Sequence, residues 1–377
     1  MHIGITIRQL RRSRNMTQES LAEYLGVSVS AVSQWESERT APDLSLIPAI
    51  CNLFCVTSDQ LLGIDLDAKQ KKIREIMERV DAHRCRGYQA EAHELLIAGL
   101  RQFPDCFEMM SALVHNDYHL MHEETYSREE REHFRDEAIR YAEMILEKCT
   151  EDVYRHSAIQ ILCYIYPTMG KLDRADELAR TMPTMSVCSD FLATAIYKGK
   201  QGYQYEKMLV YNLIQHLSNH IVAYGRKRDN GECYYTDEDK AALRDKQIAF
   251  LSLMFEKGDL GFFHCHLAVT HAAQAKYYAK KQNAENSLSH LSRASAHAIE
   301  FIAYAATDHF RHTSLLFLEH QDTGGFTTGS SENDALELLW EMESADYDFV
   351  RDHPEFCKIV EKLRPYAGKW TPASATK

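Results

Sequence analysis

Glycine and proline are scarce in this sequence, with 16 Gly and 8 Pro among 377 residues. Their share is about half of the roughly 12 % found in average proteins, so the turn residues that a many-stranded sheet requires are missing. No apolar run approaches the roughly 18 residues of a membrane-spanning helix. The chain also begins without a basic and then apolar leader. We therefore expect a mostly helical, cytoplasmic protein that makes no contact with a membrane.

The composition is otherwise that of a soluble globular protein, with 26 % charged and 45 % apolar residues. At roughly 150 residues per domain, the length allows two or three domains. The ten cysteines are scattered and form no C-x-x-C motif, which favours free thiols in a reducing compartment. Motifs of nucleophilic, nucleotide-binding and zinc-protease sites are absent from the sequence. An enzyme is therefore the least expected class, and we predict no catalytic residues and no cofactor.

The net charge of −12 would repel a polyanion at long range, so any contact with a nucleic acid has to be local. Only the N-terminal segment has a basic balance, because residues 1–40 contain five arginines and four glutamates. Residues 1–65 as a whole carry five basic and seven acidic side chains, a net charge of −2.

The first 65 residues predict five short helices. A first helix with Ile3, Ile7 and Leu10 on one face ends near residue 15. Thr17 can cap a second helix, which Gly26 closes.

The connection Gly26-Val27-Ser28 leads into a third helix, Val29–Glu36, which Ser28 can cap and whose Val32 and Trp35 face inward. A fourth helix is predicted over 42–54, with a bend or break at Pro48. Thr57 and Gln60 form the capping box of the fifth helix.

These spaced signals resemble the Xre and phage-repressor helix-turn-helix family over about 65 residues. The resemblance rests on Thr17-Gln18-Glu19-Ser20-Leu21-Ala22, Gly26-Val27-Ser28, Val32-Ser33-Gln34-Trp35-Glu36, Pro42 and the run from Val56 to Gly63. It implies that the helix beginning after Ser28 enters the major groove of double-stranded DNA.

On this register, Gln34 can pair with adenine, Ser33 can donate or accept, and Val29 can touch a thymine methyl group. Ser28 and Ser30 can contact phosphate instead of bases, and the resemblance gives Gln18 a phosphate role. Arg39 and Thr40 are further phosphate candidates. The resemblance also pairs Arg11 with Glu36 as a partly buried ion pair. The complete set of predicted DNA-binding residues is Gln18, Ser28, Val29, Ser30, Ser33, Gln34, Arg39 and Thr40.

One copy of a domain with a net charge of −2 would bind phosphate modestly. Two copies double the contacts, and this motif usually binds as a dimer to half-sites about 34 Å apart. We therefore expect a homodimer.

The remaining sequence predicts helix after helix and no strand, which makes the whole chain all-α. The expected domains are a five-helix repressor-type domain over 1–66, a helical-repeat regulatory and dimerisation domain over 67–370, and a disordered tail over 371–377. The predicted helices are 68–84, 88–102, 105–121, 128–149, 151–168, 171–181, 187–199, 203–225, 237–257, 260–281, 284–306, 308–319, 332–345 and 355–366.

Two stretches match a tetratricopeptide unit, in which a glycine turns one helix into the next and an alanine lets the two pack closely. They are Gly87, Ala92, Leu96 and Pro104, and Leu162, Tyr166, Gly170 and Ala175. The two glycines are 83 residues apart, which is not a multiple of the usual 34 or so. We therefore predict a degenerate, tetratricopeptide-like α-solenoid.

A repressor-type domain followed by such a solenoid resembles the peptide-responsive quorum-sensing regulators. This resemblance implies that the C-terminal region dimerises and holds an effector, with a peptide favoured over a protein. In the helix 203–225, four polar side chains share one face and could clamp a peptide backbone: Asn212, Gln215, His216 and Asn219. The alternative is a solvated face opposite Leu209, Leu213 and Leu217.

A group of His264, Cys265, His266 and His271 fits no strong metal-ligand spacing, so we predict no metal site there. Two functions remain open. The first is a sequence-specific DNA-binding transcriptional regulator. The second is an interaction scaffold whose solenoid binds a protein partner, while the helix-turn-helix domain does not read DNA.

Overall fold

The computed structural model describes residues 3–62, 66–226, 228–229, 232–307, 309–318, 320–322 and 326–371. The chain divides into two compact units, Met1–Glu78 and Arg79–Lys377, and the division falls within helix α6. The domain boundary expected at residue 66 stays a prediction. Apart from Thr371, the predicted disordered tail lies outside the described residues.

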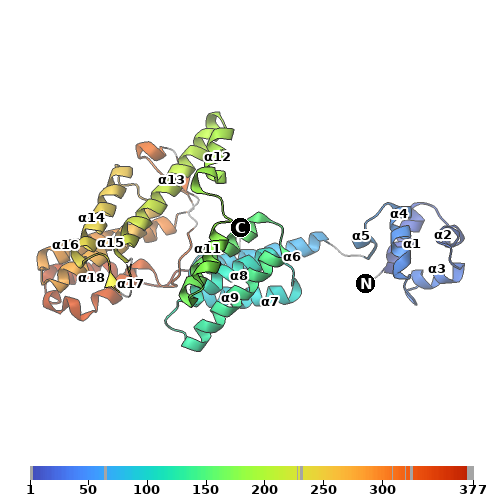
Figure 1. Ribbon diagram of the computed structural model, residues 1–377, viewed down its shortest axis with the longest axis horizontal. Coiled ribbons are helices and arrows are strands. Elements are labelled where there is room, and N and C mark those ends of the chain that lie inside the picture. Colours follow the sequence, from blue (N-terminus) through green and yellow to red (C-terminus); the bar gives the residue numbers. More distant parts are fainter. Residues whose placement is uncertain are drawn as a thin grey trace. The chain divides into compact units, whose positions relative to one another are not determined.

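Five short α-helices form the first unit together with the start of α6 (Figure 1). They enclose a single apolar core whose fully buried members are Ile7, Leu21, Val32, Ile50 and Leu61. The helices are α1 (Ile3–Ser13), α2 (Gln18–Leu25), α3 (Val29–Glu36), α4 (Ile47–Phe54) and α5 (Ser58–Leu62), with a 3₁₀ turn at Leu44–Leu46.

The predicted fourth helix is shorter than expected, and the reason is Pro48. Instead of bending a helix over 42–54, Pro48 lies in the first turn of α4, where no backbone donor is needed. The residues before it form the 3₁₀ turn, which Asp43 caps by accepting from the backbone N–H of Ser45 at 2.8 Å. The capping box of α5 is present as predicted, with Thr57 and Gln60 bonded reciprocally.

The second unit is helical almost throughout, which confirms the all-α class. Its helices are α6 (Leu66–Arg84), α7 (Gln89–Gln102), α8 (Phe107–Leu120), α9 (Arg128–Lys148), α10 (Asp152–Ile165), α11 (Leu172–Ala179), α12 (Ser189–Ile196), α13 (Gly199–Ala223), α14 (Asp237–Met254), α15 (Phe263–Lys280), α16 (Ala284–Ala305), α17 (Asp334–Met342) and α18 (Pro354–Leu363). Short 3₁₀ helices lie at Tyr166–Met169, Met185–Val187, Tyr224–Arg226, Leu315–Phe317 and Ala345–Val350.

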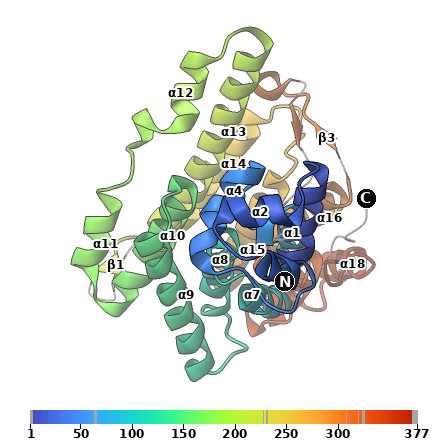
Figure 2. The ribbon, with the colours of Figure 1, turned by 90° about the vertical axis from the view of Figure 1, so that its right-hand side faces the viewer.

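Most consecutive helices of this unit pack as neighbours, as Figure 2 shows for α7, α8, α9 and α10. The pair α15 and α16 forms the centre of a second group, which α17 and α18 complete. Fully buried alanines such as Ala275, Ala279, Ala294 and Ala298 line this group, because small side chains let helix axes approach closely.

Both predicted repeat glycines lie at helix-helix turns with left-handed backbone. Gly87 (φ 78°) joins α6 to α7, and Gly170 (φ 74°) precedes α11. Ala92 and Leu96 are fully buried, as the template requires. A Cβ on Gly87 would lie 2.1 Å from the carbonyl oxygen of Ser330, so this turn also needs glycine for space.

The prediction of a helix over 308–319 is wrong, as is that of a chain without strands. Strand β3 (Phe310–Arg311) pairs with β4 (Gln321–Asp322), and β1 (Arg228–Asp229) pairs with β2 (Glu232–Cys233). The carboxylate of Asp259 accepts from the backbone N–H groups of Thr313 and Ser314. Because these donors are used by a side chain from another segment, the helix does not form.

No helix among the described residues is long and apolar enough to cross a membrane. The ten cysteines are free thiols, as the sequence predicts.

Candidate nucleic-acid interface

Helices α2 and α3 are fixed by local bonds at each end of their connection. The Thr17 hydroxyl accepts from the N–H of Ser20 at 3.1 Å, and the Ser28 hydroxyl accepts from that of Ala31 at 3.1 Å. Gly26 has left-handed backbone with φ 66°, which lets the chain turn after α2. The structure therefore confirms both predicted caps and the predicted bounds of α3.

The side chains of α3 divide into an inner and an outer face. Val32 is fully buried and Trp35 is 5 % exposed, both within the apolar core. The four residues predicted to face DNA bases are all exposed: Val29, Ser30, Ser33 and Gln34. Ser33 and Gln34 thus form an uncharged polar edge on the outer face of α3, while the inner face of the helix is packed into the core.

A buried ion pair ties α3 to α1. Arg11 donates to both carboxylate oxygens of Glu36, from Nε at 2.6 Å and from Nη2 at 2.8 Å. The Glu36 side chain is only 4 % exposed. Burial alone would raise the pKa of Glu36, but the hydrogen bonds from Arg11 and Gln18 lower it below the usual value. Glu36 therefore stays ionised, and the orientation of α3 is fixed.

Close backbone packing strengthens the same contact. A Cβ on Gly4 would lie 1.8 Å from the carbonyl oxygen of Trp35. Only glycine at this position lets α1 approach the end of α3 so closely.

The predicted phosphate contacts surround this face. Gln18 is half-buried, and its side-chain nitrogen donates to Glu36 at 2.9 Å, which the sequence did not indicate. Ser28 caps α3 through its oxygen and keeps a hydroxyl proton to donate. Arg39 and Thr40 are exposed directly after α3, and the Arg39 N–H is bonded to the Gln34 carbonyl at 2.9 Å. Their roles toward DNA stay predictions.

The predicted effector residues all lie on α13, and their role stays a prediction. Asn212 and Gln215 are half-buried on α13, whereas His216 and Asn219 are exposed. Among them, Asn219 borders a cleft of about 830 Å³ between α13, α14, α15 and α17. The alternative of a solvated face opposite Leu209, Leu213 and Leu217 also stays open: Leu209 is buried, whereas Leu217 is 50 % exposed.

The histidines of α15 pair with those of α16. His264 Nδ1 lies 2.9 Å from His297 Nδ1, and His271 Nδ1 lies 2.8 Å from His290 Nδ1. Burial lowers the pKa of His264 to about 4 and that of His271 to about 3. Each pair is a hydrogen bond between neutral rings, in which one Nδ1 donates and the other accepts.

Sequence reasoning missed one polar group, which consists of His93, Asp117 and Glu137 on α7, α8 and α9. The three residues are far apart in the sequence, so only the packing of the helices brings them together. The one available signal was the spacing of His133 and Glu137, which share a face of α9 at i and i+4.

Known proteins similar to this chain match it within or close to the first unit. Residues 7–61 match the protein-family model described as "Helix-turn-helix". The chain is 44 % identical over 63 residues to the HTH-type transcriptional activator BcrR of Enterococcus faecalis, covering 17 % of this chain and 31 % of BcrR. It is 32 % identical over 81 residues to the HTH-type transcriptional regulator YobD of Bacillus subtilis strain 168, covering 20 % of this chain and 72 % of YobD.

Some solved structures match this chain over most of its length, but at low similarity. One is Bacillus thuringiensis PlcR in complex with the peptide PapR7 and DNA, at 15 % identity and a TM-score of 0.30, covering 80 % of this chain and 96 % of that one. Another is ComR of S. thermophilus with DNA and its signalling peptide ComS, at 15 % identity and a TM-score of 0.25, covering 80 % and 95 %. At these values, no residue role is carried over from either protein.

The exposed edge of α3, the match over residues 7–61 and the likeness to YobD agree. Through its first unit, this chain belongs to the helix-turn-helix family of transcriptional regulators.

Proposed function

We propose that this protein binds specific sites on double-stranded DNA as a homodimer, reads bases with α3, and is controlled by a peptide bound in its second unit. The observation that carries the DNA-binding part is the uncharged polar edge of Ser33 and Gln34. These two side chains are exposed on a helix whose inner face is buried and whose end is fixed by the Arg11–Glu36 pair.

The outer face of α3 suits direct readout of base edges. The Gln34 amide can donate from its NH₂ group to N7 of adenine and accept at its carbonyl oxygen from the N6 amino group. The Ser33 hydroxyl can donate to or accept from a neighbouring base. Val29 is 40 % exposed and can contact a thymine methyl group. We therefore infer a half-site that contains at least one A·T pair opposite Gln34.

Phosphate binding by one copy is weak in this proposal. Among the predicted phosphate contacts, only Arg39 carries a positive charge, and residues 1–65 have a net charge of −2. Counterion release by so few cations supports modest affinity. A dimer that engages two half-sites about 34 Å apart would double the contacts, which is the physical reason for proposing a dimer.

The cleft of about 830 Å³ in the second unit has the charge pattern of a peptide site. Arg226, Lys240 and Arg244 line one part of it, and Asp334 and Glu337 line another. A smaller cleft of about 320 Å³ shares Asp334 and Glu337 with it and continues along α15. The joined groove would offer cations to a peptide carboxylate and carboxylates to a peptide ammonium group.

Asp334 is the anchor of this part of the proposal. Its Oδ2 atom is buried and has no hydrogen-bond partner among the described residues. Burial raises the pKa of Asp334 to about 7. An ammonium group bound in the groove would satisfy this oxygen and stabilise the ionised form, because an unpaired buried carboxylate is costly.

Selection of duplexes from a random pool with the full-length protein tests the proposal. We expect an enriched palindrome with two half-sites about one helical turn apart. The selection is repeated with a synthetic random octapeptide library, and peptide control predicts a change in the amount of enriched DNA. The variant Asp334→Asn should abolish that change and leave the consensus as it is. If no sequence is enriched with or without peptides, the protein does not read DNA, and the scaffold function takes its place.

A further inference from the structure

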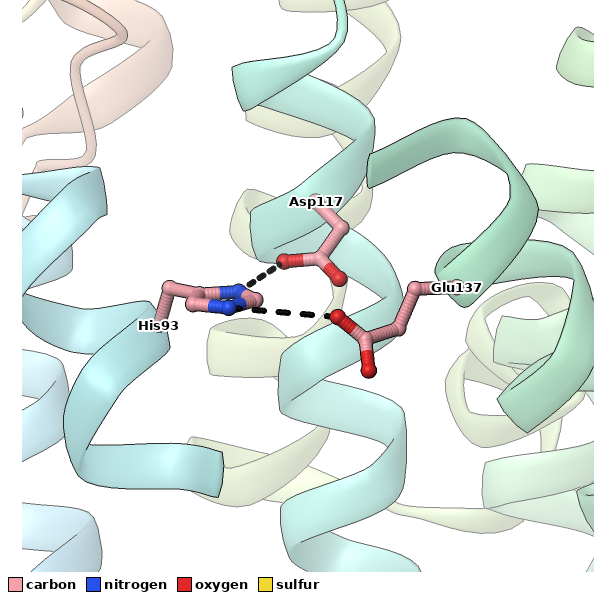
Figure 3. Close-up of side chains that lie close together, drawn as sticks. All are labelled: His93, Asp117 and Glu137. Carbon is pink, nitrogen blue, oxygen red and sulfur yellow. Dashed lines mark hydrogen bonds and ion pairs between the residues drawn. The ribbon is translucent and has the colours of Figure 1, made fainter. Parts of the chain in front are cut away.

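Helices α7, α8 and α9 bring three metal-ligating side chains together inside the second unit (Figure 3). His93 comes from α7, Asp117 from α8 and Glu137 from α9, and their ligand atoms lie within 4.8 Å of one another. The group plays no part in the DNA interface and does not border the proposed peptide groove.

Asp117 determines how the His93 ring is presented. His93 Nδ1 lies 2.7 Å from Asp117 Oδ1, within hydrogen-bond distance. An ionised carboxylate can only accept, so Nδ1 carries the proton and Nε2 keeps its lone pair. A ligating histidine in metalloproteins typically has this arrangement, with its other nitrogen donating to a carboxylate.

The Nε2 atom faces Glu137, as Figure 3 shows. The distance from His93 Nε2 to Glu137 Oε2 is 3.8 Å, too long for a hydrogen bond. Two ligands at about 2.1 Å from one tetrahedral ion lie about 3.4 Å apart. The observed separation thus needs an adjustment of a few tenths of an ångström to accept an ion.

A second imidazole reaches the same oxygen. His133 lies one turn before Glu137 on α9, and its Nε2 is also 3.8 Å from Glu137 Oε2. His133 lies outside the group whose ligand atoms are within 4.8 Å of one another. Its side chain is 71 % exposed, so a change of rotamer can bring its Nε2 toward His93 and Glu137. Both histidines line one open cleft of about 650 Å³. Arg140 Nη2 lies 3.0 Å from the other carboxylate oxygen, Glu137 Oε1, so Oε2 is the oxygen that faces the histidines.

The surroundings favour a cation. Asp117 is fully buried, and its Oδ2 atom has no hydrogen-bond partner among the described residues. A nearby cation would compensate this carboxylate. The rim of the cleft adds further negative charge from Glu91, Glu94, Glu129 and Glu130, which raises the local concentration of cations.

We propose that His93 Nε2, His133 Nε2 and Glu137 Oε2 bind one divalent transition-metal ion, and that Asp117 is the positioning residue of His93. Imidazole ligands select ions such as Zn²⁺, Co²⁺ and Ni²⁺ over Mg²⁺ and Ca²⁺. Three protein ligands leave at least one coordination position for water or a further ligand. The bound ion would join α7 to α9 and stabilise this part of the second unit.

Cobalt serves as the probe because its visible absorption reports the ligand set. Tag-free, full-length protein is stripped with a chelator and titrated with Co²⁺. We expect one Co²⁺ per chain and visible bands that Zn²⁺ removes by competition. His133→Ala and the nearly isosteric Glu137→Gln should each weaken binding at least tenfold. His216→Ala, an exposed histidine on α13, is the matched control and should bind as the wild type does.

The role of Asp117 has its own readout. Asp117→Asn should retain one ion per chain but bind it about 10–100-fold more weakly, as is typical for a carboxylate that orients a ligating histidine. Circular dichroism checks that each variant is folded, and His133→Ala is least at risk because its side chain is exposed. Absence of Co²⁺ binding, or binding that His133→Ala and Glu137→Gln leave unchanged, would overturn the proposal. The group would then be an ordinary hydrogen-bonded bridge between helices.

Discussion

Replacing Arg11 by alanine tests how firmly α3 is held. The substitution removes both bonds to Glu36 and a third, from Arg11 Nη1 to the carbonyl of Met16 at 2.6 Å. Glu36 would stay buried with Gln18 as its remaining donor in this network. Loss of one member of a buried ion pair costs about 3–5 kcal/mol. This corresponds to a rise of about 10²- to 10⁴-fold in the opening equilibrium of the first unit.

The pH dependence makes this prediction specific. In the wild type the pKa of Glu36 is lowered, so its contribution is present above the unfolded value near 4.5 and is lost as the pH falls below it. In Arg11→Ala the uncompensated burial should raise that pKa. The difference in stability between wild type and variant should therefore be largest at pH 7 and shrink below about pH 5.

Hydrogen exchange read by mass spectrometry measures this opening in peptides from α1 to α3 without interference from the second unit. Arg12→Ala is the matched control, because Arg12 is exposed on the same helix, and it should change exchange by less than about 0.5 kcal/mol. An equal effect of both substitutions, or an Arg11→Ala effect independent of pH, would refute the structural role of the pair.

Two further predictions concern the second unit. Gly87→Ala should destabilise the second unit by about 2–4 kcal/mol, because alanine would be strained in left-handed backbone and its Cβ would clash with Ser330. Gly170→Ala should cost about 1 kcal/mol, because no atom lies within 4 Å of the Cβ it would add. If urea denaturation showed a similar loss of stability for the two variants, the clash with Ser330 would be contradicted. Because the pKa values of His264 and His271 are lowered to about 4 and 3, the stability that they contribute should be complete above about pH 6.5 and fall as the pH decreases toward 4. His271→Gln should flatten this decline in the urea midpoint, and a wild-type midpoint that is constant from pH 6.5 to 5 would contradict it.

Local sequence signals were sufficient to predict the bounds and the inner face of the helices α2 and α3. Thr17, Ser28 and Gly26 act through bonds to residues at most four positions away, so their sequence spacing predicts helix bounds. The inward direction of Val32 and Trp35 follows from helical periodicity in the same way. Pro48 was misplaced because a proline signal does not tell whether the helix begins at that residue or continues through it.

Tertiary contacts explain why predictions from the sequence failed in the second unit. The segment 308–319 has helical periodicity, but a carboxylate from Asp259, more than fifty residues away, takes the backbone donors. The group of His93, Asp117 and Glu137 depends on the packing of three helices. No spacing rule connects residues 24 and 44 positions apart, so the i and i+4 spacing of His133 and Glu137 on α9 was the one local signal of this group.

The consensus sequence selected by a Gln34 variant tests the central claim most directly. If Gln34 reads adenine, Gln34→Arg should select a site in which one base pair of each half-site changes from A·T to G·C, because arginine pairs with guanine. Arg39→Ala should weaken binding to all duplexes and keep the wild-type consensus. Selection of the same consensus by wild type and Gln34→Arg would contradict base reading by this edge of α3.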